Sequence, residues 1–231
     1  MARNKLAVIT LLMAFCLGAT LVANADPVAT LKIFDNYGNT VTITDGGLGD
    51  VNSAAGAITF VGAIGDWNIN VDTGLTIPAT AANQLQDLNF VDTKTTTNHQ
   101  STLTILFGAI NYDNPLGIFN ITNHIGGTQT GLDNVAYNVY FDASNNLFAG
   151  GLVASSGAMS VSPFGYANSI FGLNNSGGMY SLYQEVILTS NLGTANASGD
   201  GQLLIPEPAS MSILGAGLLG LAGLFRRKLV K

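Results

Sequence analysis

The sequence has little cysteine and little positive charge. Its single cysteine, Cys16, lies in the first apolar run, so no intrachain disulfide can stabilise the protein. Between residues 26 and 205 only Lys32 and Lys94 are cationic, against thirteen acids, which leaves a formal net charge of −11 in that span. A surface this acidic repels phosphate backbones. We therefore expect a fold held together by burial, and no nucleic-acid partner.

Signatures of common active sites and metal sites are also missing. The chain has no G-x-S-x-G segment for a serine nucleophile. His99 and His124 stand alone, without the spacing of zinc ligands. A glycosidase needs two carboxylates across a cleft, and Glu185 is the only glutamate before the final 27 residues, 205–231. We expect no enzyme activity and no metal site, with a secreted polysaccharide-active enzyme as the alternative.

Two acidic, turn-rich segments leave calcium open as a cofactor. Residues 45–50 and 142–146 offer hard oxygen ligands of the kind that calcium prefers. Neither segment has the spacing of an EF-hand loop or of a repeated calcium-binding nonapeptide. Turn formation alone explains both, because aspartate and asparagine stabilise turns through main-chain contacts. We expect no cofactor, and keep a calcium-dependent carbohydrate-binding module as an alternative.

The first 25 residues have the three parts of a secretory signal peptide. Arg3 and Lys5 precede an apolar run over residues 6–22, and Ala23 and Ala25 form the small-x-small site that a signal peptidase cuts. The sequence therefore predicts a signal helix over residues 1–25 and export through the Sec machinery.

A second set of signals, residues 205–231, opens with a proline pair. Pro206 and Pro208 flank Glu207, and neither proline can donate a main-chain hydrogen bond. The residue before each proline is pushed into extended geometry. We expect an extended, exposed strip here that a processing enzyme can grip.

An apolar run and a basic cluster follow the prolines. The uncharged residues 209–225 would reach about 26 Å as a helix, the lower limit for a membrane span. Arg226, Arg227 and Lys228 come directly after, and such cations stay on the cytoplasmic side. The sequence predicts a single transmembrane helix that anchors the chain transiently in the inner membrane.

This order of features resembles the PEP-CTERM sorting tail of exported Gram-negative proteins, a tail also catalogued as an ice-binding protein C-terminal domain. Residues 56–78 resemble a stretch that such proteins often carry near their mature N-terminus. The resemblance implies processing by an exosortase that recognises Pro206, Glu207 and Pro208. It implies delivery to the cell surface or outside the cell, and a link to exopolysaccharide or biofilm.

Between the two ends, residues 26–204 are predicted to form one all-β domain. Short runs alternate apolar and polar residues and are separated by Gly and Asn turn signals. The runs are residues 31–34, 41–44, 58–60, 67–71, 88–90, 103–107, 135–141 and 180–188. Outside the two ends no segment is convincing as a helix of three turns, and Ala79–Leu88 is the nearest candidate. So many short strands predict a jelly-roll-like β-sandwich, with a β-solenoid as the alternative.

These features favour a non-catalytic structural or adhesive domain that contacts exopolysaccharide. Aromatic side chains can stack on sugar rings, and Trp67, Tyr112 and Tyr166 are the candidates, although core packing is the simpler explanation for Trp67.

Overall fold

A computed structural model describes residues 27–73, 83–95, 98–113, 117–176 and 178–206. The described part consists of β-strands joined by turns. The strands are β1 (Val28–Asp35), β2 (Thr40–Thr44), β3 (Thr59–Ile64), β4 (Trp67–Thr73), β5 (Asn83–Lys94), β6 (Ser101–Asp113), β7 (Ile118–Thr130), β8 (Asn134–Asp142), β9 (Gly151–Met159), β10 (Phe164–Asn174), β11 (Met179–Ser190) and β12 (Ala195–Pro206).

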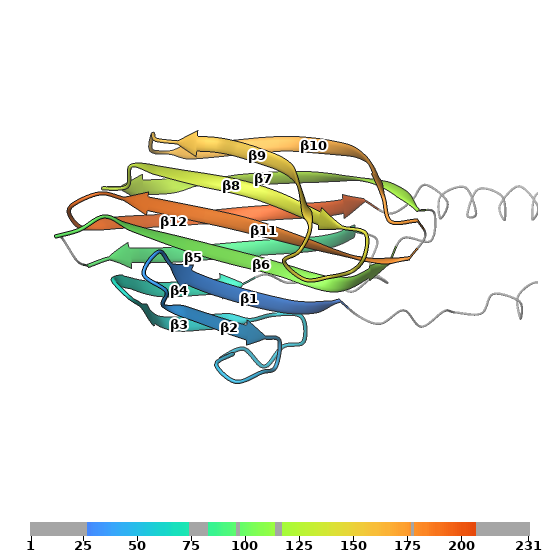
Figure 1. Cartoon of the computed structure of the whole chain (residues 1–231), viewed down its shortest axis with the longest axis horizontal. Helices are drawn as coiled ribbons and strands as arrows, with labels where there is room; N and C mark the ends of the chain where they lie inside the picture. The colour runs from blue at the N-terminus through green and yellow to red at the C-terminus, as the bar shows by residue number, and fades with distance from the viewer. Residues whose placement is uncertain (1–26, 74–82, 96–97, 114–116, 177, 207–231) are drawn as a thin grey trace, which may run out of the picture.

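The strands form two antiparallel six-stranded sheets that lie face to face (Figure 1). Sheet A has the order β2-β1-β6-β11-β8-β9, and sheet B has the order β10-β7-β12-β5-β4-β3. From β5 to β12 the chain crosses between the sheets at every connection except β8 to β9. The predicted all-β sandwich is confirmed, and the alternative β-solenoid is wrong. β1 begins and β12 ends at the same end of the sandwich (Figure 1).

Both predicted helices fall outside the described residues, and the one further helix candidate is not a helix where it is described. The signal helix over residues 1–25 and the transmembrane helix over residues 209–225 are not in the described part. Within that part, no helix has the length and apolar character needed to cross a membrane. The helix candidate Ala79–Leu88 fails because its residues from Asn83 onward belong to β5, where every second side chain is buried between the sheets.

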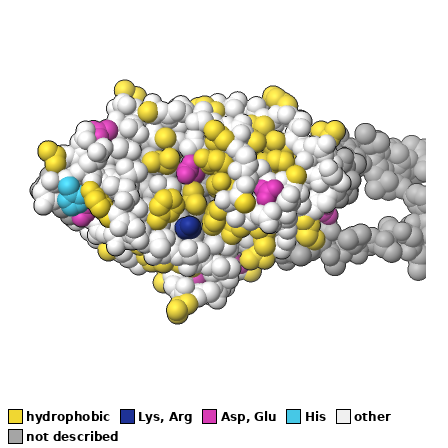
Figure 2. All heavy atoms as spheres, viewed as in Figure 1, with side chains coloured by type: hydrophobic (Ala, Val, Ile, Leu, Met, Phe, Trp, Pro, Cys, Tyr) yellow, Lys and Arg dark blue, Asp and Glu magenta, His cyan; other side chains and the backbone are white. Residues whose placement is uncertain are grey.

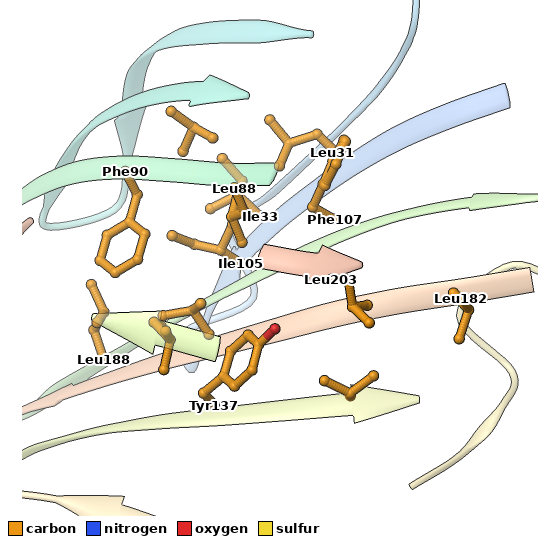
Figure 3. Packing of buried hydrophobic residues seen from close by; sticks show 14 of the residues in the cluster. Leu31, Ile33, Leu88, Phe90, Ile105, Phe107, Tyr137, Leu182, Leu188 and Leu203 are labelled. Carbon is orange, nitrogen blue, oxygen red and sulfur yellow. The ribbon is translucent and has the colours of Figure 1, made fainter. Parts of the chain in front are cut away.

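The hydrophobic core lies between the two sheets, as the two-residue period of the strands requires. Leu31, Ile33 and Phe107 from sheet A point toward Leu88 and Phe90 from sheet B (Figure 3). All five are almost completely shielded from solvent. Burying one such side chain is worth about 1.5–3 kcal/mol, so the core supplies the main stabilisation of a chain that has no disulfide.

Polar side chains inside the core connect the two sheets. The Gln86 amide, from β5, donates to the Tyr112 hydroxyl at 2.8 Å and to the Leu182 carbonyl at 2.9 Å, both in sheet A. Gln184, from β11, accepts from the Tyr137 hydroxyl at 2.7 Å and donates to the Gln86 carbonyl at 3.3 Å. These bonds fix the relative position of the sheets, because breaking one would leave a buried polar group without a partner.

Lys94 is buried at the end of the sandwich opposite the end of β12. Its Nζ donates to the carbonyls of His99 at 2.7 Å, Asn191 at 2.6 Å and Gly193 at 3.3 Å. The Lys94 side chain has no exposed surface, although the sequence analysis included its charge in the net charge of the surface. Lys94 therefore ties β5 to the β11–β12 turn.

We predict that Lys94→Met lowers the free energy of unfolding by about 3 kcal/mol, because three buried carbonyls lose a charged donor. Urea unfolding followed by the fluorescence of Trp67, the only tryptophan, measures the change. The control Lys32→Met, on the outer face of sheet A, should change stability by only about 0.5 kcal/mol. Equal losses in the two variants would contradict a structural role for the Lys94 ammonium.

Candidate functional site

Two of the three aromatic residues predicted to stack on sugars do not face solvent. Trp67 and Tyr112 are completely buried between the sheets, and Trp67 donates from Nε1 to the Ser101 hydroxyl at 2.8 Å. The prediction of a stacking role is therefore wrong for Trp67 and Tyr112. Tyr166 is partly buried and packs against the core with its ring 6.5 Å from that of Tyr137, so a stacking role for it stays a prediction.

A different set of aromatic side chains lies on the outer face of sheet A. We name this set, together with the apolar and charged side chains between its members, the aromatic face. Its residues are Lys32, Phe34, Leu106, Asn138, Tyr140, Phe148, Leu152, Tyr183 and Glu185. Figure 2 shows hydrophobic side chains gathered on this side around a cation and acidic side chains. A solvent-facing sheet surface is normally polar, so this face requires an explanation.

A stacked tyrosine pair forms one part of the aromatic face. Tyr140 and Tyr183 are direct partners on β8 and β11, with ring centroids 4.5 Å apart and planes 5° apart. Phe148, in the loop after β8, meets Tyr183 edge to face at 5.3 Å. Gly108 lies opposite Tyr183 on β6, where an added Cβ would come within 2.4 Å of the Tyr183 Cβ. The small residue thus lets the pair lie close to the sheet.

Hydrogen-bonding groups lie beside the tyrosine pair, two residues further along the same strands. Glu185 Oε2 accepts from Asn138 Nδ2 and from the Tyr140 hydroxyl, both at 2.8 Å. Leu106 separates Glu185 from Lys32 in the register of β11, β6 and β1. Lys32 Nζ lies 5.4 Å from the ring centroid of Phe34. Partial burial, and then the bond to Glu185, raise the pKa of Tyr140, so its hydroxyl stays protonated and donates.

This arrangement combines an apolar floor with charged hydrogen-bonding groups at its sides. Leu106 and Tyr183 are buried beneath their neighbours. The accessible part of the face is formed by the exposed Leu152 and by Tyr140, Glu185 and Lys32, which are half-buried. A carboxylate and an ammonium form stronger hydrogen bonds with neutral hydroxyls than neutral groups do. The face can therefore bind a flat, hydroxyl-rich molecule. The sequence contained part of the signal, because Tyr140 is out of phase with the buried Val135, Tyr137 and Val139 on β8.

The acidic segments considered for calcium serve as turns. Asp45 accepts from the Gly56 amide at 2.7 Å, and Asp50 accepts from three main-chain amides, those of Gly46, Asn52 and Thr59. Asp142 accepts from the Ser144 and Asn146 amides, and these bonds, Ser144 first, hold its pKa below the usual range. These carboxylates therefore already have main-chain partners.

Neither histidine gathers further ligands. His99 Nε2 lies 2.5 Å from Asp66 Oδ2, and its ring meets Tyr37 edge to face at 5.1 Å. His124 lies on the outer face of sheet B, opposite Gln202. Among the residues that the structure describes, no group of three or more histidine, cysteine or acidic side chains is placed to hold a metal ion.

Two carboxyl groups meet on the outer face of sheet B. Asp87, on β5, and Asp200, on β12, lie on neighbouring strands, and burial together with the nearby Asp87 carboxyl raises the pKa of Asp200 to about 6. Asn89 donates to Asp87 at 3.0 Å, and Gln202 donates to Asp200 at 3.4 Å. Glycosidases place their two carboxyls across a cleft so that a sugar fits between them, whereas these two lie on the same face of one sheet.

The first residue of the predicted sorting tripeptide lies within the fold. β12 continues through Pro206, which is paired with Asn83 at the start of β5. Ile205 is buried, so the expected strip is extended at this residue but is not exposed there. Glu207, Pro208 and the basic cluster Arg226 to Lys228 lie outside the described residues, as do the cleavage residues Ala23 and Ala25.

We predict that Asp200→Asn stabilises the protein above about pH 6 and has little effect near pH 4. The folded pKa of Asp200, about 6, is higher than its ordinary value of 3.8. The stabilising contribution of this group is therefore complete below its ordinary pKa and is lost as the pH rises through 6. Melting temperatures of both proteins, measured across this range, should diverge as the pH rises. Parallel profiles would show that the pair shares no proton.

Three solved structures similar to this chain share only a low sequence identity with it. TmCBM61, solved with β-1,4-galactotriose, is 10% identical, with 61% of this chain and 88% of that chain covered and a TM-score of 0.32. The K1 cleaved adhesin domain of Lys-gingipain from Porphyromonas gingivalis is 8% identical, with 66% and 98% covered and a TM-score of 0.35. The mannan-recognising module TmCBM27 is 9% identical, with 62% and 90% covered and a TM-score of 0.30. No curated protein matches the chain.

The predicted tail is confirmed at the level of the sequence family. Residues 204–228 match the PEP-CTERM protein-sorting motif. The match begins within β12 and includes the proline pair, the apolar run and the basic cluster. The chain therefore carries a PEP-CTERM sorting motif, which indicates an exported protein that an exosortase processes.

Proposed function

We propose that this protein is delivered to the cell surface or the extracellular matrix, where its jelly-roll-like sandwich binds polysaccharide without catalysis. Its inner-membrane anchor would be the helix over residues 209–225, held until an exosortase acts at Pro206, Glu207 and Pro208. The aromatic face would bind the polysaccharide. Exopolysaccharide or a biofilm matrix is the ligand class that an exported adhesive domain of this kind would meet.

The observation that carries this proposal is the row of Glu185, Leu106 and Lys32 beside the tyrosine pair. A sugar ring has an apolar face of C–H groups and a rim of hydroxyls. The aromatic and aliphatic floor fits the first, while Glu185 and Lys32 can accept from and donate to the second. A flat sheet face also suits a long polymer, which can extend past both ends of the site.

A polysaccharide-active enzyme is the second candidate, and the Asp87–Asp200 pair is what favours it. A small hollow beside the pair is lined by Asn70, Asn89, Phe90, Val91, Ser198 and Gly199. Two carboxyls on the same face of one sheet suit a shared proton better than they suit a general acid and a nucleophile on either side of a substrate. Release of reducing ends from a bound polysaccharide, lost in Asp200→Asn, would favour the enzyme.

We predict that Tyr140→Ala and Glu185→Gln each weaken polysaccharide binding by at least about tenfold, the effect of losing a central contact. A glycan array with the purified protein first identifies the ligand, and isothermal titration calorimetry then measures its Kd. The matched control is Tyr37→Ala, which removes an aromatic ring that is 55% exposed at the Lys94 end of the sandwich. If Tyr37→Ala weakens binding as much as the other two, the site is not the aromatic face.

We predict that Glu207→Ala combined with Pro208→Ala keeps the protein in the membrane fraction of a host that contains an exosortase, where the unchanged protein is released. Pro206 is left in place because it is paired with Asn83 in the sheet. Immunoblots of membrane and medium report the distribution. In a host without an exosortase both proteins should stay membrane-bound. Release of the double variant at the normal level would argue against recognition through this motif.

A further inference from the structure

Apolar side chains gather on the outer face of sheet B where β12 ends. Phe171 on β10 is 74% exposed, Ile118 on β7 is 62% exposed and Leu204 on β12 is 36% exposed. Leu85 on β5 is partly exposed and pairs directly with Leu204. The four residues lie on four consecutive strands, β10, β7, β12 and β5. We name them the tail-end patch.

The patch is confined to the rows closest to the sorting motif. Leu204 lies opposite Leu85 and Thr122, two residues before Pro206. One row further from this end, Gln202 lies opposite Asp87 and His124, and the face becomes polar and charged. The inward side chains of the same strand, Leu203 and Ile205, are buried. The four apolar side chains are thus a local feature of this end, and the other exposed apolar side chains of this sheet face, Val61 on β3 and Val91 on β5, lie on either side of the polar Asn70.

The chain leaves no spacer between the patch and the apolar run of the tail. Only Ile205, Pro206, Glu207 and Pro208 separate Leu204 from residue 209. Five residue steps span at most about 18 Å even when fully extended. The interfacial layer of a bilayer is about 5–8 Å thick on each side of the hydrocarbon. A tail embedded in the membrane therefore holds the patch close to the lipid surface.

We infer that the tail-end patch rests on the lipid surface while the tail anchors the protein, so that the sandwich docks on the membrane by this end. The inference builds on the proposed function, because it needs the anchored state that precedes processing. Exposed phenylalanine and leucine side chains favour the boundary between headgroups and acyl chains. The neighbouring acids, Asp87 and Asp200, disfavour anionic headgroups, so the contact is apolar and insensitive to salt.

Site-specific fluorescence on residues 26–231, the chain without its predicted signal peptide, tests this docking. In this chain, which lacks Cys16, a single cysteine is introduced as Phe171→Cys and labelled with an environment-sensitive maleimide dye. The matched control is Leu192→Cys, 72% exposed in the turn between β11 and β12. Both proteins are reconstituted into phosphatidylcholine vesicles that carry a nitroxide at the headgroup. We expect several-fold stronger quenching at position 171 than at position 192, unchanged by added salt.

Flotation of the same vesicles separates the two possible failures. If the protein floats but both dyes are quenched equally weakly, the docking inference is overturned while tail anchoring stands. A blue-shifted dye at position 171 without nitroxide quenching would mean that a second copy of the chain covers the patch, and this also overturns it. If the protein does not float, both the anchor and the docking are wrong. Ile118→Cys repeats the test from β7, and an unchanged melting temperature shows that each variant is folded.

Discussion

The pairing of β12 between β5 and β7 is the constraint on which the rest of the structure depends. At the start of the strand, the Lys94 ammonium holds the turn through the carbonyls of Asn191 and Gly193. At its end, Pro206 is both the last paired residue and the first residue of the sorting tripeptide. A strand bonded on both sides cannot slide or detach without opening sheet B. The fold therefore fixes the position of Pro206, the first residue of the sorting motif.

Because β12 sets the end of the sandwich at which the tail begins, that end and the outer faces of the two sheets have different surroundings. The end at Pro206 carries apolar side chains on four consecutive strands, of which Leu85 is only partly exposed. The aromatic face lies on the outer side of the other sheet, so a membrane docked at this end would leave it uncovered. The Asp87–Asp200 pair lies next to the tail-end patch, and the raised pKa of Asp200 makes stability depend on pH. The proposed docking of the tail-end patch on the membrane is thus compatible with the proposed binding of polysaccharide to the aromatic face.

The sequence predicted the class of fold and the sorting motif, because both depend on local patterns. Alternation predicted β1, β2, β6, β8 and β11 of sheet A and β3, β4 and part of β5 of sheet B, but it missed β7, β9, β10 and β12. β12 contains Gly199 and Gly201, which interrupt its apolar pattern. Gly199 is needed because an added Cβ there would lie 2.6 Å from the Phe90 ring. β7 alternates strictly in the structure and could have been found from the sequence. Trp67 lies on the inner face of its strand, whereas Tyr140 lies on the outer face of its strand. Which face of a strand is buried depends on where the other sheet packs, and the sequence of one strand does not give that.

Mass spectrometry of the released protein, from a host that contains an exosortase, tests the central claim most directly. Because Ile205 is buried and β12 is paired through Pro206, removal of the tail must spare these residues. The account predicts a carboxyl terminus after Pro206 and before the apolar run that begins at residue 209. Released protein that keeps residues 209–231, or that ends before Ile205, would contradict it.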